Sequence, residues 1–121
     1  MIESEGRYFG RKQGKSFQRL SRFQKLLFKP SKLFFKNIKN QTLVLEIGIG
    51  DGMKISEDAS LNLNKTYIGC DIFIDGILRA ARHQSEKNLK NLFVFYNNVQ
   101  DLLPYISNSS LDTVRIYFPD P

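Results

Sequence analysis

The sequence predicts an α/β fold built around a parallel, doubly wound sheet of the Rossmann-like class. From residue 41 onward, short apolar runs typical of buried strands alternate with stretches of helical spacing. The first run ends in a cluster of glycines, and the links between elements are short. Parallel strands joined by crossover helices produce this alternation.

The expected strands are short and rich in β-branched and aromatic residues, as buried parallel strands are. They cover residues 42–48, 66–72, 92–96 and 113–118. Helices are expected at about 52–61 and at 75–88, and a helical turn at 100–105. The apolar face of the second helix is expected to contain Ile77, Leu78, Ala81 and Ser85.

Upstream of these elements the chain has a different character. Apolar residues at helical spacing predict an amphipathic helix over 17–28, which Pro30 ends or kinks. A second short helix or turn is expected at 31–40, anchored to the body by Leu33, Phe34 and Phe35. Most of the phenylalanines in this part are expected to serve such anchoring, with base stacking as the alternative.

Charge divides the chain into two parts. Residues 1–40 contain eleven Lys or Arg and two acids, a balance of +9, whereas residues 41–121 contain seven and ten, a balance of −3. We therefore expect a basic N-terminal arm (1–40) attached to a mildly acidic body (41–121). Such asymmetry favours a polyanion partner such as RNA, with a solvated tail as the alternative. The best candidates for RNA contact are Arg7, Arg11, Lys12 and Lys15.

Composition argues against several classes of protein. No apolar run approaches the roughly 18 residues that span a bilayer, and the first ten residues have no signal-peptide core. A single cysteine, Cys70, excludes an intrachain disulfide, and one cysteine with one histidine argues against a zinc site. Cys70 is expected to be a small core residue, and the protein to be cytoplasmic.

The strongest chemical signal is the segment 46–52, Glu-Ile-Gly-Ile-Gly-Asp-Gly, which follows the first strand. Glycines such as Gly48 and Gly50 permit a tight turn and let a ligand approach the backbone. A dinucleotide fingerprint would need a glycine at Met53, and a pyrophosphate would be repelled by Glu46. A carboxylate instead suits the ammonium and sulfonium of S-adenosyl-L-methionine. The alternative is a plain turn.

Further polar residues end the later strands. Asp71 lies 23 residues after Gly48, the spacing of an acid that binds ribose hydroxyls, although a strand-end Asp also caps turns. Asn98 follows the third strand, where its amide would meet an adenine edge, or serve only as a turn residue. After the fourth strand, two prolines flank Asp120 and would hold its carboxylate beside the methyl donor, unless this loop merely ends the strand.

Four segments together resemble the bacterial tRNA (guanine-N7)-methyltransferase family. They are YFGRKQG (8–14), LEIGIGDG (45–52), IGCDIFIDG (68–76) and SLDTVRIYFPDP (110–121). The resemblance implies a class I methyltransferase fold with strand order 3-2-1-4 and S-adenosyl-L-methionine as cofactor. It implies methylation of N7 of a guanine in the variable loop of tRNA, at position 46. Family members are expected to be monomers without metal.

The same resemblance implies roles for individual residues. Glu46 and Asp71 match the cofactor-contacting acids, Asn98 stands where the family usually has Asp, and Asp120 matches the proposed catalytic acid, also beside the cofactor. The family continues past the last proline with Trp, basic residues and further strands. We therefore expect a fragment whose fourth strand has an exposed edge.

Three alternatives remain open from the sequence. The first is an S-adenosylmethionine enzyme that acts on a small molecule or a protein. The second is a non-catalytic RNA-binding remnant. The third is a nicotinamide-dependent oxidoreductase, which Met53 and Glu46 disfavour.

Overall fold

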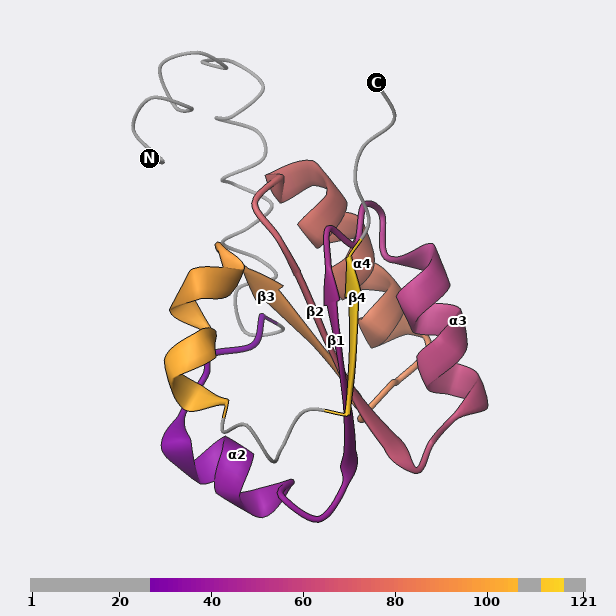
Figure 1. Ribbon diagram of the computed structural model, residues 1–121. Coiled ribbons are helices and arrows are strands. Elements are labelled where there is room, and N and C mark those ends of the chain that lie inside the picture. Colours follow the sequence, from indigo (N-terminus) through magenta and orange to yellow (C-terminus); the bar gives the residue numbers. More distant parts are fainter. Residues whose placement is uncertain (1–26, 107–111, 117–121) are drawn as a thin grey trace.

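The computed structural model describes residues 27–106 and 112–116, and it confirms the predicted sheet (Figure 1). Four parallel strands, β1 (Thr42–Ile47), β2 (Lys65–Asp71), β3 (Leu92–Tyr96) and β4 (Thr113–Ile116), are arranged in the order β3-β2-β1-β4. The carboxyl ends of the strands therefore share one edge, where ligands bind in open α/β sheets.

Helical elements cover both faces of this sheet. On one side lie α3 (Met53–Leu61) and α4 (Ile74–Glu86); on the other lie α2 (Lys32–Asn37) and two 3-10 turns, η2 (Val99–Asp101) and η3 (Leu103–Tyr105) (Figure 1). Both body helices and the helical turn at 100–105 were predicted from the sequence. The α/β fold class is confirmed.

Alternation along the strands divides the interior into two cores, because successive side chains in a strand point to opposite faces. Val44, Tyr67 and Val94 pack with the buried faces of α3 and α4. Leu45, Ile68 and Phe95 pack on the other face with Phe35 of α2 and Leu102. Cys70 belongs to this second core, as predicted; its burial raises the pKa of the thiol to about 12, so the thiol is protonated at neutral pH.

An aromatic cluster joins α2 to the sheet. The rings of Phe28 and Phe34 are 4.6 Å apart, and Phe34 meets Phe93 at 4.7 Å in an edge-on arrangement. The predicted anchoring role is confirmed for Phe34 and Phe35, and Phe28 shares it. It is wrong for Leu33, which points away from the body with 66% of its surface exposed.

Two other expectations need correction. The predicted helix over 17–28 does not extend through its described end, because Leu27 forms a parallel bridge with Val94 and the Phe28 N–H donates to the Val94 carbonyl at 2.7 Å. The rest of that helix lies outside the described residues. In α4 the buried face contains Ala80, whereas Ser85 is exposed, because the helix is rotated so that the side bearing Ala80 faces the core.

The outer edge of β4 is open within the described part of the chain. Val114 and Ile116 are 48% and 52% exposed, and the strand pairs only with β1 there. Asp112 fixes its start: its carboxylate accepts from the Leu43 N–H at 2.7 Å and its own N–H donates to the Leu43 carbonyl at 3.0 Å. The expected exposed edge is thus present in the described residues.

Asn91 holds the amino end of the sheet together. Its Nδ2 donates to the carbonyls of Ala59, Asn62 and Lys65, each at 3.0 Å. We expect Asn91→Ala to lower the free energy of unfolding by about 2 kcal/mol, because three part-buried carbonyls lose the amide donor that joins them. Urea denaturation checks this, with Asn64→Ala, an exposed asparagine in the turn that precedes β2, as the control. Equal midpoints for Asn91→Ala and the wild type would contradict it.

Candidate active site at the glycine loop

The loop after β1 has a backbone that only glycine adopts without strain. Gly48, Gly50 and Gly52 have φ of 81°, 60° and 77°, all in the left-handed region. The loop runs from the carboxyl end of β1 to the first residue of α3. This explains why the sequence spaces glycines at every second position, and it places the loop at the edge where a ligand is expected.

Close packing seats this loop on α4. A Cβ at Gly76 would lie 2.2 Å from the Gly50 carbonyl oxygen, and a Cβ at Gly52 would lie 2.4 Å from the Ala80 Cβ. Gly50 differs, because a Cβ there would meet nothing within 4 Å. The loop is therefore fixed from below by α4 and open above Gly50, where a ligand has access to its backbone.

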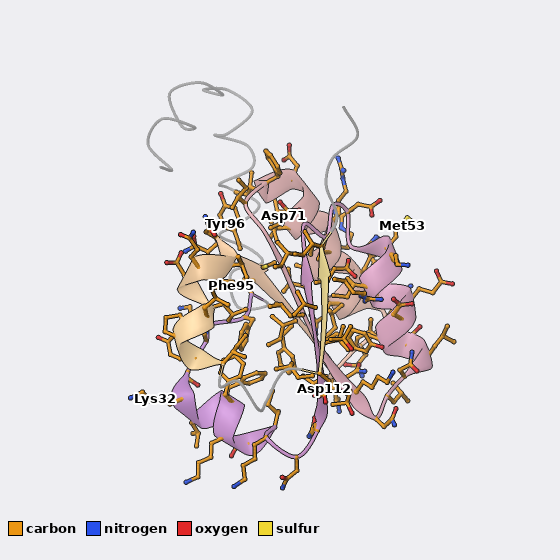
Figure 2. The ribbon with its side chains drawn as sticks, viewed as in Figure 1. Lys32, Met53, Asp71, Phe95, Tyr96 and Asp112 are labelled. Atoms are coloured by element: carbon orange, nitrogen blue, oxygen red, sulfur yellow. The ribbon has the colours of Figure 1, made fainter. Side chains whose placement is uncertain are left out.

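Asp71, at the end of β2, ties the loop to the start of α4. One carboxylate oxygen, Oδ2, accepts from the Gly50 N–H at 3.1 Å. The other, Oδ1, accepts from the backbone N–H groups of Ile72 and Phe73 at 2.7 and 3.2 Å. Figure 2 shows Asp71 and Tyr96 at the same end of the sheet, opposite Lys32. Asp71 thus orders the predicted ligand edge, and its ribose-binding role stays a prediction.

Glu46 lies beneath the loop and is 1% exposed. Its Oε1 forms an ion pair with Nη2 of Arg115 at 2.9 Å, although within the described residues no donor is aligned with this oxygen as a hydrogen bond requires. Burial raises the pKa of the Glu46 carboxyl, and Arg115 opposes that shift. A buried carboxylate has acceptor sites beyond this one ion pair and suits a ligand with an ammonium group, so the residues present fit the predicted cofactor.

Two residues beside Glu46 were not singled out from the sequence. Arg115 of β4 stands directly opposite Glu46 in the strand register, and its Nη1 is 2.6 Å from Asp58 Oδ2 of α3. The available signal was an arginine inside an otherwise uncharged expected strand, 113–118. Such a residue implies an acid in a neighbouring element, although not which one.

Asn98 follows β3 and is half-buried. Its Oδ1 accepts from the Gln100 N–H at 3.1 Å and so caps η2. The structure thus shows the turn role that the sequence left as an alternative, and the amide Nδ2 remains a donor for a ligand. Contact with adenine is still a prediction.

The remaining predicted site residues lie outside the described ranges. These are Asp120 and the four basic residues of the arm, Arg7, Arg11, Lys12 and Lys15. Within residues 27–106 and 112–116, no three metal-type side chains gather into a possible metal site. The helices described there are too short or too polar to cross a membrane.

A glycine loop that is open above Gly50 lies at the carboxyl edge of a parallel sheet, with Glu46 and Asp71 beside it, and this is the place where α/β proteins of the doubly wound class bind nucleotide-like cofactors. A family model described as "Putative methyltransferase" matches residues 40–121, which is most of the chain, so the chain belongs to this methyltransferase family. The family depends on S-adenosylmethionine, as the sequence indicated.

Curated relatives support the resemblance inferred from the sequence. The chain is 35% identical over 121 residues to a bifunctional methyltransferase of Rickettsia prowazekii, covering 95% of this chain and 23% of the relative. It is 36% identical over 77 residues to a tRNA (guanine-N(7)-)-methyltransferase of Caulobacter vibrioides, covering 64% of this chain and 34% of the relative. The chain therefore spans about a quarter to a third of these relatives.

Solved structures confirm the fold. An antibiotic-related methyltransferase superposes with a TM-score of 0.63 at 23% identity, over 78% of this chain and 50% of that one. TrmK of M. capricolum, in complex with S-adenosyl-homocysteine, superposes with a TM-score of 0.52 at 21% identity, over 78% and 39%. Both are methyltransferases, so the predicted class I architecture is confirmed.

Proposed function

We propose that the chain provides the methyl-donor site of a tRNA (guanine-N7)-methyltransferase. The donor is S-adenosyl-L-methionine, and the acceptor is N7 of the variable-loop guanine at position 46 of tRNA. The observation that carries the donor site is the pairing of an open backbone at Gly50 with the buried carboxylate of Glu46, whose Oε1 forms an ion pair but no aligned hydrogen bond within the described residues. The identity with the Caulobacter tRNA enzyme supports the choice of acceptor.

The donor's groups match the residues along the carboxyl edge. Glu46 faces the ammonium of the methionine moiety, and the backbone at Gly48 and Gly50 lets that moiety pass close to the loop. Asp71 accepts from the ribose hydroxyls, for which a carboxylate with two oxygens retains acceptor capacity beyond its backbone bonds. The Nδ2 of Asn98 donates to the adenine edge. S-adenosylmethionine supplies an activated methyl group on a sulfonium.

Guanine N7 carries a lone pair in the plane of the ring, so attack needs no proton removal. The protein has to align N7 with the methyl group and to stabilise the positive charge that passes to the purine. We assign this second task to Asp120, whose carboxylate would hydrogen-bond the base edge and counter the charge.

The basic arm would hold the tRNA through its phosphates, with Arg7, Arg11, Lys12 and Lys15 as the contacts. Phosphate contacts position an RNA without reading its sequence, so shape would select the substrate. Binding should weaken steeply with salt, because each neutralised phosphate releases counterions.

Transfer of tritiated methyl groups to tRNA transcripts tests the proposal. We expect label in a tRNA with guanine at position 46 and none in the same transcript with adenine there, with the label located at N7 by cleavage chemistry. Label in both transcripts, or in protein and metabolite pools only, would refute the assigned acceptor. Salt-sensitive tRNA binding and no transfer would instead show a non-catalytic RNA-binding chain.

A further inference from the structure

Three charged side chains from three separate elements meet beneath the glycine loop. Arg115 of β4 places Nη2 2.9 Å from Glu46 of β1 and Nη1 2.6 Å from Asp58 of α3. The guanidinium carbon lies 5.8 Å from the ring centre of Tyr67 on β2. One cation therefore bridges two acids, and one of those acids is the proposed donor ligand.

We propose that Arg115 is a positioning residue for methyl-donor binding: it keeps the buried carboxylate of Glu46 ionised and fixed beneath the glycine loop. This inference rests on the proposed function, because the proposed function has Glu46 bind the ammonium group of the donor. Arg115 itself does not touch the donor; it acts through Glu46.

The burial of Glu46 is what makes such a partner necessary. A carboxylate removed from water favours its neutral form, and a protonated Glu46 offers the donor no negative charge. The side chain of Glu46 is 2% exposed, whereas that of Arg115 is 24% exposed and partly hydrated. A partly hydrated guanidinium is a low-cost counterion for a buried acid, because it gives up little of its own solvation.

The neighbours of Glu46 act in opposite directions. Arg115 and Lys54 lower the pKa of Glu46, whereas Asp58 raises it; Tyr67 and Cys70 are also near, and both are neutral at physiological pH. Without Arg115, the carboxylates of Glu46 and Asp58 would repel each other, and Lys54 would be the remaining cation among these neighbours. With Arg115 present, the two acids Glu46 and Asp58 are balanced by the two cations Arg115 and Lys54, and Arg115 is the cation that contacts both acids.

The first arm of the test follows donor affinity with pH. S-adenosylmethionine is titrated calorimetrically into the wild-type chain, Arg115→Gln and Arg115→Lys between about pH 8.5 and pH 6. The Kd of each variant is divided by that of the wild type at the same pH, which cancels the titration of the donor's own amino group. We expect the Kd ratio of Arg115→Gln to rise as the pH falls, by up to about tenfold per pH unit. In this variant Glu46 is protonated at a higher pH than in the wild type, and it must lose that proton before it can bind the donor's ammonium.

Arg115→Lys retains the charge and should keep the ratio nearly flat. A flat ratio for Arg115→Gln would overturn the inference, and so would a lysine variant that behaves like glutamine. If the wild type binds no S-adenosylmethionine at any pH, it is the proposed function that fails.

The second arm of the test uses no S-adenosylmethionine. It therefore distinguishes failure of the inference about Arg115 from failure of the proposed function. The Glu46 carboxyl is titrated by ¹³C NMR in the ligand-free chain. Arg115→Gln should raise the pKa of Glu46, because the neighbouring positive charge is lost. Asp58→Asn should lower that pKa, because the repulsion between the two acids is removed and Arg115 then pairs with Glu46 only. Glu57→Gln, an exposed acid on the same helix, should leave it unmoved.

Asp58→Asn still tests the inference if the Arg115 variants fail to fold. This variant keeps Arg115, and with it the contact between Arg115 of β4 and Glu46 of β1. A Glu46 pKa that is unchanged in Asp58→Asn would overturn the inference even then.

Discussion

The Gly76→Ala chain is expected to lose about 2 kcal/mol of folding free energy and at least tenfold in donor affinity. The added Cβ would lie 2.2 Å from the Gly50 carbonyl oxygen, which is backbone and cannot rotate away. Overpacking of this kind costs about 1–3 kcal/mol or more, and the better helix propensity of alanine returns about 1 kcal/mol at most. The loop must lift off α4, which moves the backbone that the donor approaches.

Urea denaturation and calorimetry with S-adenosylmethionine measure the two effects. Gly50→Ala is a comparison for the stability effect, because its Cβ enters open space and the expected cost comes from the left-handed φ of 60° alone, about 1–2 kcal/mol. It should nonetheless weaken donor binding, since the methyl group occupies the space above the loop. If Gly76→Ala were as stable as the wild type and bound the donor equally well, the packing of the loop against α4 would not be needed for stability or for donor binding, and the prediction would be wrong.

Glu46→Gln is expected to weaken S-adenosylmethionine binding by about 10- to 100-fold. A hydrogen bond to a charged group contributes about 1.5–3 kcal/mol, and glutamine keeps the size of the side chain while removing the charge. Arg115 retains Asp58 as its partner in this variant. Calorimetry checks the affinity, with Glu57→Gln as an exposed control of equal charge change; equal affinity for both variants would contradict the assignment.

The same substitution has a defined effect on stability against pH. Burial raises the pKa of Glu46 above its unfolded value, so the folded state binds the proton more tightly than the unfolded state does. This contribution to stability is complete below the unfolded pKa and is lost as the pH rises through the folded pKa. Glu46→Gln removes that dependence, and urea midpoints across the acidic range measure it.

Much of the framework follows from local sequence. Apolar runs bounded by glycine and polar residues predicted all four strands, and the alternation of strands and helices predicted a parallel sheet. The segment 46–52 predicted the tight glycine turn after the first strand, which the positive φ angles confirm, while the ligand that this loop would hold stays a prediction. Leu33 and Ser85 were misplaced since helical spacing alone does not say how a helix is rotated against its sheet.

The environment of Glu46 could not be predicted in the same way. Its contact with Arg115 depends on the register between β1 and β4, strands separated by more than sixty residues. Its link to Asp58 depends on how α3 packs across the sheet. For Asp71 the sequence left a ribose ligand and a strand-end cap open, and it did not indicate that the carboxylate accepts three backbone N–H groups, one of them in the glycine loop. These are consequences of tertiary packing.

The central claim is that the methyl donor sits above Gly50, beside Glu46. A titration of the ¹⁵N-labelled chain with S-adenosylmethionine tests it most directly. The account predicts saturable shifts of the Gly50 and Ile72 amides, with those of α2 (Lys32–Asn37), at the opposite end of the sheet, unmoved (Figure 2). A saturated titration in which the Gly50 amide does not shift, or in which the α2 amides shift instead, would contradict it.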